Sequence, residues 1–170
     1  NEDVIGIMPT GAGKSICFQI PALCKPGLTI VFSPLISLMK DQVDGLLVQN
    51  IPASLINSTL TQAEFNKTMY EVRSGKIKLL YIAPERLSSN FFCNVLRALP
   101  IAQVIVDEAH CISEWGHDFR PSYRLIGEWL NSLPKRPIVG AFTATATKYV
   151  ENDIKKLLGL DTANVYVTGF

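Results

Sequence analysis

Short apolar runs rich in β-branched residues recur along the chain, and longer segments with helical periodicity separate them. The runs show no apolar–polar alternation, which is typical of strands that are buried on both faces of a sheet. Strands are predicted at residues 4–8, 28–33, 79–83, 104–107, 138–142 and 165–167, with 53–56 as an additional candidate. Helices are predicted at residues 15–24, 36–49, 61–73, 88–99 and 148–158.

Residues near the helix ends support these bounds. Thr61 and Glu64 have the spacing of a capping box, in which each side chain binds the other residue's backbone amide. Gly75 and Gly159 follow two of the predicted helices, at positions where glycine commonly ends a helix. Strands that alternate with helices predict an α/β fold with a mainly parallel sheet and right-handed crossovers.

Composition narrows the class of protein. The 170 residues suit one domain with a sizeable core, and 48% hydrophobic and 18% charged residues are typical of a globular protein. The formal net charge of +1 excludes a global basic field, so any nucleic-acid binding must be local. No apolar run approaches the roughly 18 residues of a membrane span. We expect an intracellular protein, in the nucleus if it is eukaryotic and in the cytoplasm or nucleoid if it is bacterial.

The cysteines favour the same compartment. Cys17, Cys24, Cys93 and Cys111 lie in apolar or mixed surroundings and form no CxxC pair. This pattern predicts buried free thiols rather than a metal site. Free thiols are typical of a reducing environment.

Both ends of the chain suggest a fragment. Residue 1 comes only a few residues before a glycine-bearing loop, and the strand-like run at 165–170 has no tail after it. We therefore expect residues 1–170 to form one domain that is truncated at both ends.

The stretch MPTGAGKS at residues 8–15 lies between a predicted strand and a predicted helix, the context that a phosphate-binding loop requires. Gly11 and Gly13 can adopt backbone angles that a Cβ would block, so that amides converge on phosphates near the helix N-terminus. Lys14 adds a positive charge, and Ser15 adds a hydroxyl for Mg²⁺. The strict pattern has glycine where this chain has Met8, and an ordinary glycine turn is the alternative. The predicted nucleotide-binding residues are Met8, Pro9, Thr10, Gly11, Ala12, Gly13, Lys14 and Ser15.

Two carboxylates, Asp107 and Glu108, follow a buried strand and need a cationic partner. Mg²⁺ bound to a triphosphate would supply one, with Asp107 and Ser15 as its predicted protein ligands. Glu108 could then orient and deprotonate a water molecule. The alternative for an isolated Asp-Glu pair is a solvated turn.

The next segment combines aromatic and charged side chains within six positions. Trp115 and Phe119 could stack on unpaired bases at roughly 1–3 kcal/mol each. Arg120 could pair with phosphate or stack, and with His117 it is a poor core residue. The segment could sense a single strand and move His110 or Glu108. A core-packing loop with a buried tryptophan is the alternative.

These stretches resemble the first RecA-like domain of superfamily 2 helicases, and specifically the RecQ family of DNA helicases. The resemblance covers nearly the whole chain in order, and the run after DEAH is its most family-specific part. The matching stretches are MPTGAGKS at 8–15, SPLISLMKDQV at 33–43, LLYIAPERL at 79–87, DEAHCISEWGHDFRPSY at 107–123 and FTATAT at 142–147.

The resemblance implies a RecA-like (P-loop NTPase) three-layer sandwich that uses ATP and Mg²⁺. It implies ATP hydrolysis coupled to translocation along single-stranded DNA and to unwinding of duplex DNA, in the 3′ to 5′ direction. The catalytic residues would be Lys14, Asp107, Glu108 and His110. A second RecA-like domain would follow this one and would carry a further catalytic arginine, and an adenine-reading glutamine would precede it. The isolated fragment is expected to bind nucleotide weakly and not to unwind.

The same resemblance assigns residues to DNA binding or to its coupling with hydrolysis. In the segment after residue 33, Leu35, Ile36, Leu38 and Met39 are interpreted as mostly core. Pro84, Glu85 and Arg86 fit either a strand-contact motif or the first turn of a helix. The predicted DNA-binding or coupling residues are Ser33, Ser37, Lys40, Trp115, His117, Phe119, Arg120, Thr143 and Thr145.

Two alternatives remain open. The same core could belong to another superfamily 2 enzyme, either an RNA helicase or a translocase that does not separate strands. A non-catalytic, nucleotide-dependent interaction module is the other, and the presence of Lys14, Asp107 and Glu108 argues against it.

Overall fold

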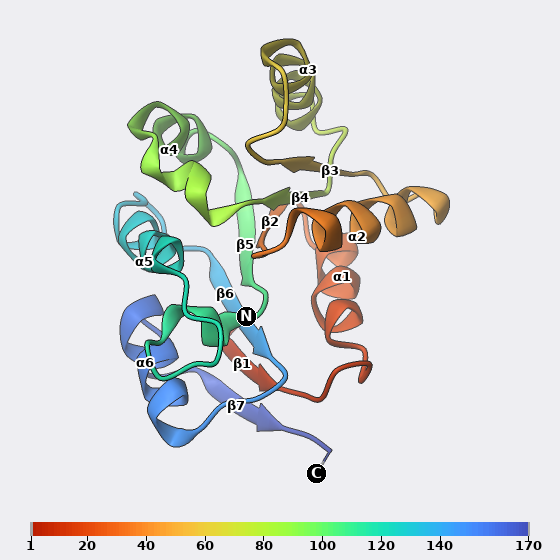
Figure 1. Ribbon diagram of the computed structural model, residues 1–170. Coiled ribbons are helices and arrows are strands. Elements are labelled where there is room, and N and C mark those ends of the chain that lie inside the picture. Colours follow the sequence, from red (N-terminus) through yellow and green to blue (C-terminus); the bar gives the residue numbers. More distant parts are fainter. Residues whose placement is uncertain (1, 170) are drawn as a thin grey trace.

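A computed structural model describes residues 2–169, so Asn1 and Phe170, the ends of the expected domain, lie outside it. The strands of the described residues form one sheet in the order β3-β4-β2-β5-β6-β1-β7, and every pair of neighbours is parallel (Figure 1). The strands are β1 (Val4–Ile7), β2 (Leu28–Phe32), β3 (Ala53–Ile56), β4 (Leu79–Ile82), β5 (Ile101–Val106), β6 (Ile138–Thr143) and β7 (Asn164–Val167). The predicted parallel α/β fold is confirmed, and the additional candidate strand is β3.

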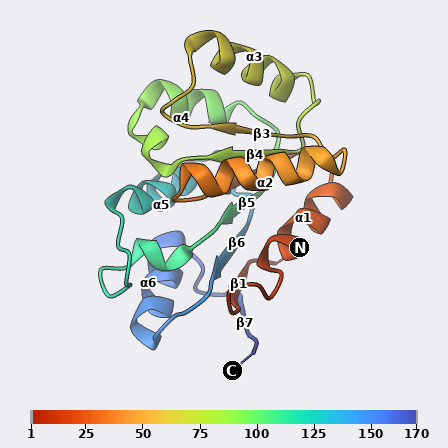
Figure 2. The same ribbon diagram turned by 45° about the vertical axis from the view of Figure 1, so that its right-hand side comes forward.

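Helices cover both faces of the sheet and make a three-layer sandwich (Figure 2). The α-helices are α1 (Lys14–Cys24), α2 (Ile36–Val48), α3 (Gln62–Arg73), α4 (Asn90–Arg97), α5 (Arg124–Asn131) and α6 (Lys148–Leu158). One core lies between the sheet and α3, α4, α5 and α6, and the other lies between the sheet and α1 and α2. Neighbouring residues of one strand pack into the two cores on opposite faces of the sheet. Ile30 and Val31 of β2 are an example. This double burial explains why the strands read as continuous apolar runs.

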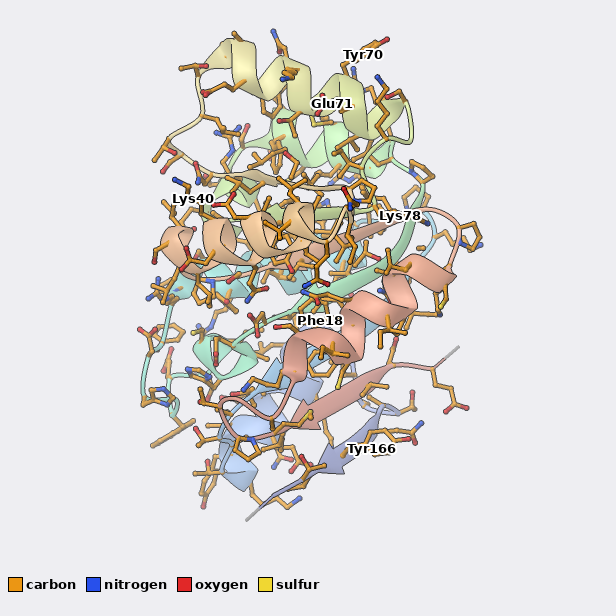
Figure 3. All side chains as sticks on the ribbon, turned by 90° about the vertical axis from the view of Figure 1, so that its right-hand side faces the viewer. Phe18, Lys40, Tyr70, Glu71, Lys78 and Tyr166 are labelled. Carbon is orange, nitrogen blue, oxygen red and sulfur yellow. The ribbon has the colours of Figure 1, made fainter. Side chains whose placement is uncertain are left out.

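Strand β7 departs from that expectation. Tyr166 and Val167 are 56% and 55% exposed, because β7 is an edge strand that pairs only with β1. Figure 3 shows Tyr166 on this edge. The apolar run therefore predicted the strand correctly but not its burial.

Helix α1 contacts the sheet through a narrow face. Phe18 and Ala22 are buried one turn apart, whereas Ile16, Ile20 and Leu23 are exposed. Cys17 and Cys24 on α1 are also exposed, so the expectation of four buried thiols is wrong for these two, although Cys93 and Cys111 are buried and all four are free. None of the helices described here has the length and hydrophobicity that crossing a membrane requires.

The predicted signals mark the start of α3 and the end of α6. Thr61 and Glu64 form the capping box at the start of α3, and Gly159 ends α6 in the left-handed conformation. The prediction missed α5, which is only 8 residues long and contains Gly127. This glycine is required by packing: a Cβ there would lie 1.9 Å from the carbonyl oxygen of Leu157 on α6. The missing side chain lets the two helices approach closely.

We predict that Gly127→Ala lowers the free energy of unfolding by about 2–3 kcal/mol, because the new methyl group forces α5 away from α6. Urea unfolding followed by circular dichroism would measure the change. The control is Gly45→Ala on α2, where a Cβ meets nothing within 4 Å. That substitution should stabilise the chain by about 0.5–1 kcal/mol. Equal effects of the two substitutions would contradict the packing argument.

Candidate nucleotide site and its coupling network

Because every strand is parallel, the segments that follow β1, β5 and β6 lie at one edge of the sheet. Ligands of open parallel sheets bind at this carboxyl edge. The predicted nucleotide loop follows β1, the acidic pair follows β5, and Thr143 ends β6. The fold thus brings together residues that are more than one hundred positions apart in the sequence.

The loop after β1 has the backbone that its glycines predict. Gly11 and Gly13 have φ angles of 81° and 83°, and a Cβ at either would meet nothing within 4 Å. The space over the loop is therefore open. Gly13 is the N-cap of α1 and makes no side-chain cap, so the loop leads directly into a helix N-terminus that attracts anions. These features fit a phosphate group.

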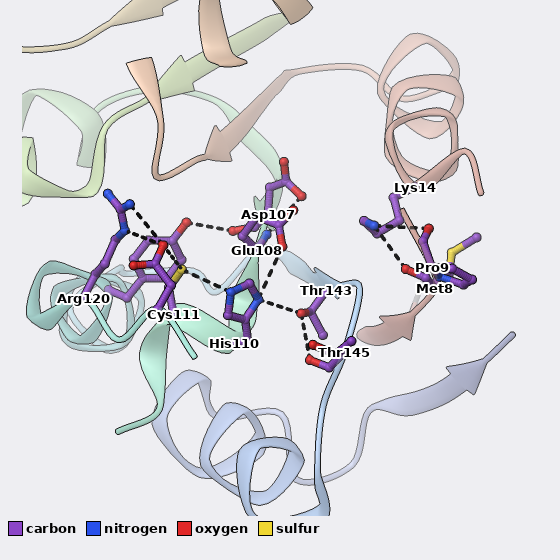
Figure 4. A network of polar contacts seen from close by, with 12 residues as sticks. Met8, Pro9, Lys14, Asp107, Glu108, His110, Cys111, Arg120, Thr143 and Thr145 are labelled. Atoms are coloured by element: carbon purple, nitrogen blue, oxygen red, sulfur yellow. Dashed lines mark hydrogen bonds and ion pairs between the residues drawn. The ribbon is translucent and has the colours of Figure 1, made fainter. Parts of the chain in front are cut away.

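Lys14 folds back over this loop. Its Nζ donates hydrogen bonds to the carbonyl oxygens of Met8 at 3.1 Å and Pro9 at 3.4 Å (Figure 4). Neutral carbonyls bind an ammonium less strongly than anionic oxygens do. A phosphate placed over the loop would therefore compete well for the Lys14 ammonium.

Asp107 is held rigidly at the end of β5. Its amide donates to the carbonyl oxygen of Phe32, and its carbonyl oxygen accepts a hydrogen bond of 2.8 Å from the Tyr123 hydroxyl. Its carboxylate Oδ1 accepts from the amide of Glu108 at 3.0 Å. Burial, with the nearby charge of Glu108, raises the pKa of Asp107 to about 6. A buried acid of this kind is readily ionised by a neighbouring cation.

The donor set fits Mg²⁺ that is held together with a nucleotide. Ser15 and Asp107 offer oxygen ligands, and no group of three or more His, Cys, Asp or Glu residues within 2–169 could form a protein-only metal site. Mg²⁺ usually takes one or two carboxylates, with phosphates and waters completing its shell. When bound, it would neutralise charge on the phosphates.

Glu108 occupies an unusual backbone conformation, with a φ angle of 48°. Left-handed angles are uncommon for residues other than glycine and often mark functional sites. Its Oε2 lies 3.3 Å from Nδ1 of His110, and its side chain is 28% exposed. The hydrogen bond with His110 is the main cause that lowers the pKa of Glu108. Glu108 is therefore ionised at neutral pH and is partly accessible to water.

A hydrogen-bond network connects Glu108 to the end of β6 (Figure 4). Nδ1 of the buried His110 lies 2.8 Å from Oγ1 of Thr143, which donates in turn to the carbonyl oxygen of Thr145 at 3.1 Å. A hydroxyl carries one proton, so the Thr143 oxygen must accept from His110. Nδ1 of His110 therefore carries the proton, and this tautomer is set by the network.

The aromatic-rich segment lies directly over this network. The ring of His117 stacks on that of His110, with centroids 4.1 Å apart and planes 18° apart. Gly116 makes this approach possible, since a Cβ there would lie 2.4 Å from the carbonyl oxygen of His110. A displacement of the segment would therefore change the packing of the His117 ring on His110.

Other side chains of this segment differ in their accessibility. Trp115 is 74% exposed, which argues against a loop built on a buried tryptophan; the buried one is Trp129. Arg124 lies over the Phe119 ring, 5.1 Å from its centroid. Arg120 binds Asp118 and also donates to the carbonyl oxygen of Pro34 at 3.0 Å, so it ties the segment to the residues after β2.

The residues after β2 are only partly as predicted. Ser37 and Lys40 are exposed, as a DNA contact requires, but Ser33 is fully buried and its side chain does not support a direct contact in this conformation. The interpretation of Leu35 and Ile36 as core is wrong, because they are 46% and 41% exposed. The reason is that α2 packs through later residues, namely Met39, Val43 and Leu46.

The segment Pro84–Ser88 forms a 3-10 helix with Pro84 in its first turn. Glu85 accepts a hydrogen bond from Ser122, and the guanidinium of Arg86 lies over the rings of Phe65 and Phe92. These contacts favour the helical alternative for this segment.

Sequence reasoning missed two positioning residues within the motif it had noted. Tyr123 is fully buried and holds the backbone of Asp107. Ser113 is also fully buried; its hydroxyl donates to Asp153 on α6 at 2.6 Å and accepts from the amide of Trp115.

A glycine loop and an acidic pair at one edge of a parallel sheet, with helices on both faces, define a P-loop nucleotide-binding domain of RecA-like fold. Solved structures share this fold. The helicase domain of Hef from Pyrococcus furiosus matches 98% of this chain and 35% of that chain, with a TM-score of 0.74 at 17% identity. A hypothetical ATP-dependent RNA helicase from Sulfolobus tokodaii matches 98% of this chain and 48% of that chain, with a TM-score of 0.72 at 19% identity.

The sequence matches the DEAD/DEAH box helicase family over residues 1–153, and the chain belongs to that family. Its similarity to RecQ helicases is high. The ATP-dependent DNA helicase RecQ of Bacillus subtilis is 53% identical over 164 residues, which are 96% of this chain and 28% of that protein. The ATP-dependent DNA helicase Q5 of Mus musculus is 47% identical over 165 residues, covering 94% of this chain and 17% of that protein. The predicted RecQ resemblance is confirmed, and the chain spans less than a third of the length of these relatives.

We predict that Asp107→Asn stabilises the chain at pH 8 but not at pH 4. The folded pKa of about 6 lies above the ordinary 3.8, so wild-type stability falls between about pH 4 and 6 and stays lower above that range. The difference is up to about 3 kcal/mol. Urea unfolding at the two pH values would measure it, with Asp44→Asn, at an exposed position on α2, as the control. A gain that is equal at both pH values would contradict the prediction.

Proposed function

We propose that this chain is the first of two RecA-like domains of a RecQ-like DNA helicase. In this proposal it binds ATP with Mg²⁺ and hydrolyses ATP in the complete protein. Hydrolysis would drive movement along single-stranded DNA and unwinding of duplex DNA, with 3′ to 5′ polarity. The protein would act inside the cell, in whichever compartment holds the DNA.

One observation carries this proposal. Glu108, the candidate base, is linked through His110 both to Thr143 on β6 and to His117 in the exposed aromatic segment. An ATPase that acts on no polymer has no need of the contact between His110 and His117. The names of the relatives, which are ATP-dependent DNA helicases, support the choice of polymer.

Different residues of this chain would bind the nucleotide, hold Mg²⁺ and activate water. The loop amides and Lys14 would hold the phosphates, and Ser15 with Asp107 would hold Mg²⁺. Glu108 is ionised and partly exposed, so it could orient a water molecule and accept its proton. His110 keeps the Glu108 carboxylate in place through its Nδ1 proton, which Glu108 and the Thr143 oxygen share in a three-centre hydrogen bond. Bases stacked on the aromatic segment would shift His117, and with it His110.

We predict that single-stranded DNA stimulates ATP hydrolysis by the complete protein more strongly than RNA of the same sequence does. Trp115→Ala should lower this stimulation at least about fivefold, because a lost stacking contact costs about 1–3 kcal/mol. Steady-state phosphate release would measure both effects. The matched control is Phe91→Ala, which removes an aromatic ring that is 70% exposed on α4 and should leave the stimulation unchanged. Stronger stimulation by RNA would favour an RNA helicase.

The isolated 170-residue chain should bind ATP weakly and show no strand displacement, since the proposed second domain supplies the remaining catalytic groups. Equilibrium titration with a fluorescent ATP analogue would measure the binding. A gel assay with a labelled duplex carrying a single-stranded tail would measure unwinding. Robust unwinding by the isolated chain would refute the two-domain proposal.

A further inference from the structure

An exposed aromatic pair lies beside the network, and only one of its members belongs to the aromatic segment. The ring of Trp115 lies 6.0 Å from that of Tyr149 on α6, centroid to centroid, with the planes 37° apart. Both side chains are unusually accessible for their size, at 74% and 71% exposed. Tyr149 is outside every segment that the sequence analysis assigned to DNA.

Hydrogen bonds through Ser113 connect the backbone of Trp115 to helix α6, which carries Tyr149. Ser113 donates a hydrogen bond of 2.6 Å to Asp153 of α6 and accepts one of 3.1 Å from the amide of Trp115. The backbone that carries Trp115 is thereby fastened to the helix that carries Tyr149. This arrangement keeps the rings together although both project into solvent.

A pocket of about 330 Å³ opens next to the pair, between the aromatic segment and the start of α6. It is lined by His110, Trp115, Gly116, His117, Thr145, Ala146, Thr147 and Val150. Thr145 accepts the hydrogen bond from Thr143, which in turn accepts from His110. An occupant of the pocket would therefore touch two parts of the network that ends at Glu108.

We propose that Tyr149 and Trp115 together form a stacking surface for one unpaired base, whose edge enters the adjacent pocket. This inference rests on the proposed function and adds a DNA-contacting residue on α6. A base sandwiched between two rings needs about 7 Å, twice the usual contact distance. The observed 6.0 Å is too short, so the base lies across the pair rather than between its members.

The chemistry of the surface favours a nucleic-acid base over an apolar partner. Lys148, whose side chain is 84% exposed, lies next to Tyr149; its Nζ is paired with Glu151 at 2.9 Å, and its remaining N–H groups could meet a phosphate. The pocket wall contains Thr145, Thr147 and His117, which can hydrogen-bond the polar edge of a base. Aromatic faces beside cationic side chains are typical of single-strand binding sites.

Tryptophan fluorescence tests the proposal directly. The chain has two tryptophans, and Trp129 is only 3% exposed, so Trp115 supplies the accessible emission. An oligo-dT strand should quench this emission in the wild-type chain. Tyr149→Ala should raise the dissociation constant between about 5- and 160-fold, and Tyr149→Phe should change it less than about twofold. The control is Tyr70→Ala on α3, where a tyrosine that is 68% exposed lies at the opposite end of the molecule from β7 (Figure 3).

Two further measurements separate stacking from other effects. An abasic strand of the same length should bind the wild type and Tyr149→Ala equally, because no base is present to stack. The slope of log affinity against log salt should be the same for both, since no phosphate contact is removed. A changed slope, or an unchanged affinity of Tyr149→Ala for oligo-dT, would overturn the inference alone. Absence of any oligo-dT binding by the complete protein would overturn both the inference and the proposed function.

Discussion

The parallel pairing of β5 with β2 on one side and β6 on the other is the constraint on which the site depends. It places β5 near the middle of the sheet, so Asp107 emerges from the core at the carboxyl edge. The same pairing puts the end of β6 next to it, where Thr143 can bind His110. An antiparallel neighbour would have sent that threonine to the opposite edge. The network is thus a product of strand direction as much as of side-chain chemistry.

Burial gives the two neighbouring carboxylates different properties. Asp107 lies in the protein interior, where its charge is disfavoured and its pKa rises. Glu108 turns outward through its left-handed backbone and meets His110, which lowers its pKa. Two adjacent acids after one strand therefore differ in their electrostatics, since the pKa of Asp107 is raised and that of Glu108 is lowered.

Much of the fold could be predicted from the sequence, because buried strands and helix caps leave local signals. The capping box at Thr61 and the left-handed glycines of the nucleotide loop are examples. Failures arose where tertiary context decides: α5 is short and contains a glycine that only its packing against α6 explains. The exposure of Ile36 likewise depends on the face through which α2 packs, which Met39, Val43 and Leu46 form. The candidate residues of the site were proposed largely from motifs, whereas the stacking of His117 on His110 has no signature in the sequence.

Arg120 has more hydrogen-bond donors than its contacts within the protein use. A guanidinium has five N–H groups. Within residues 2–169, Nε and Nη2 bind Asp118 and Nη1 binds the carbonyl oxygen of Pro34, which accounts for three of the five. Two donors are left for a phosphate oxygen. Arg120 can therefore hold two loops together and bind an anion at the same time, so that binding of the anion need not separate the loops.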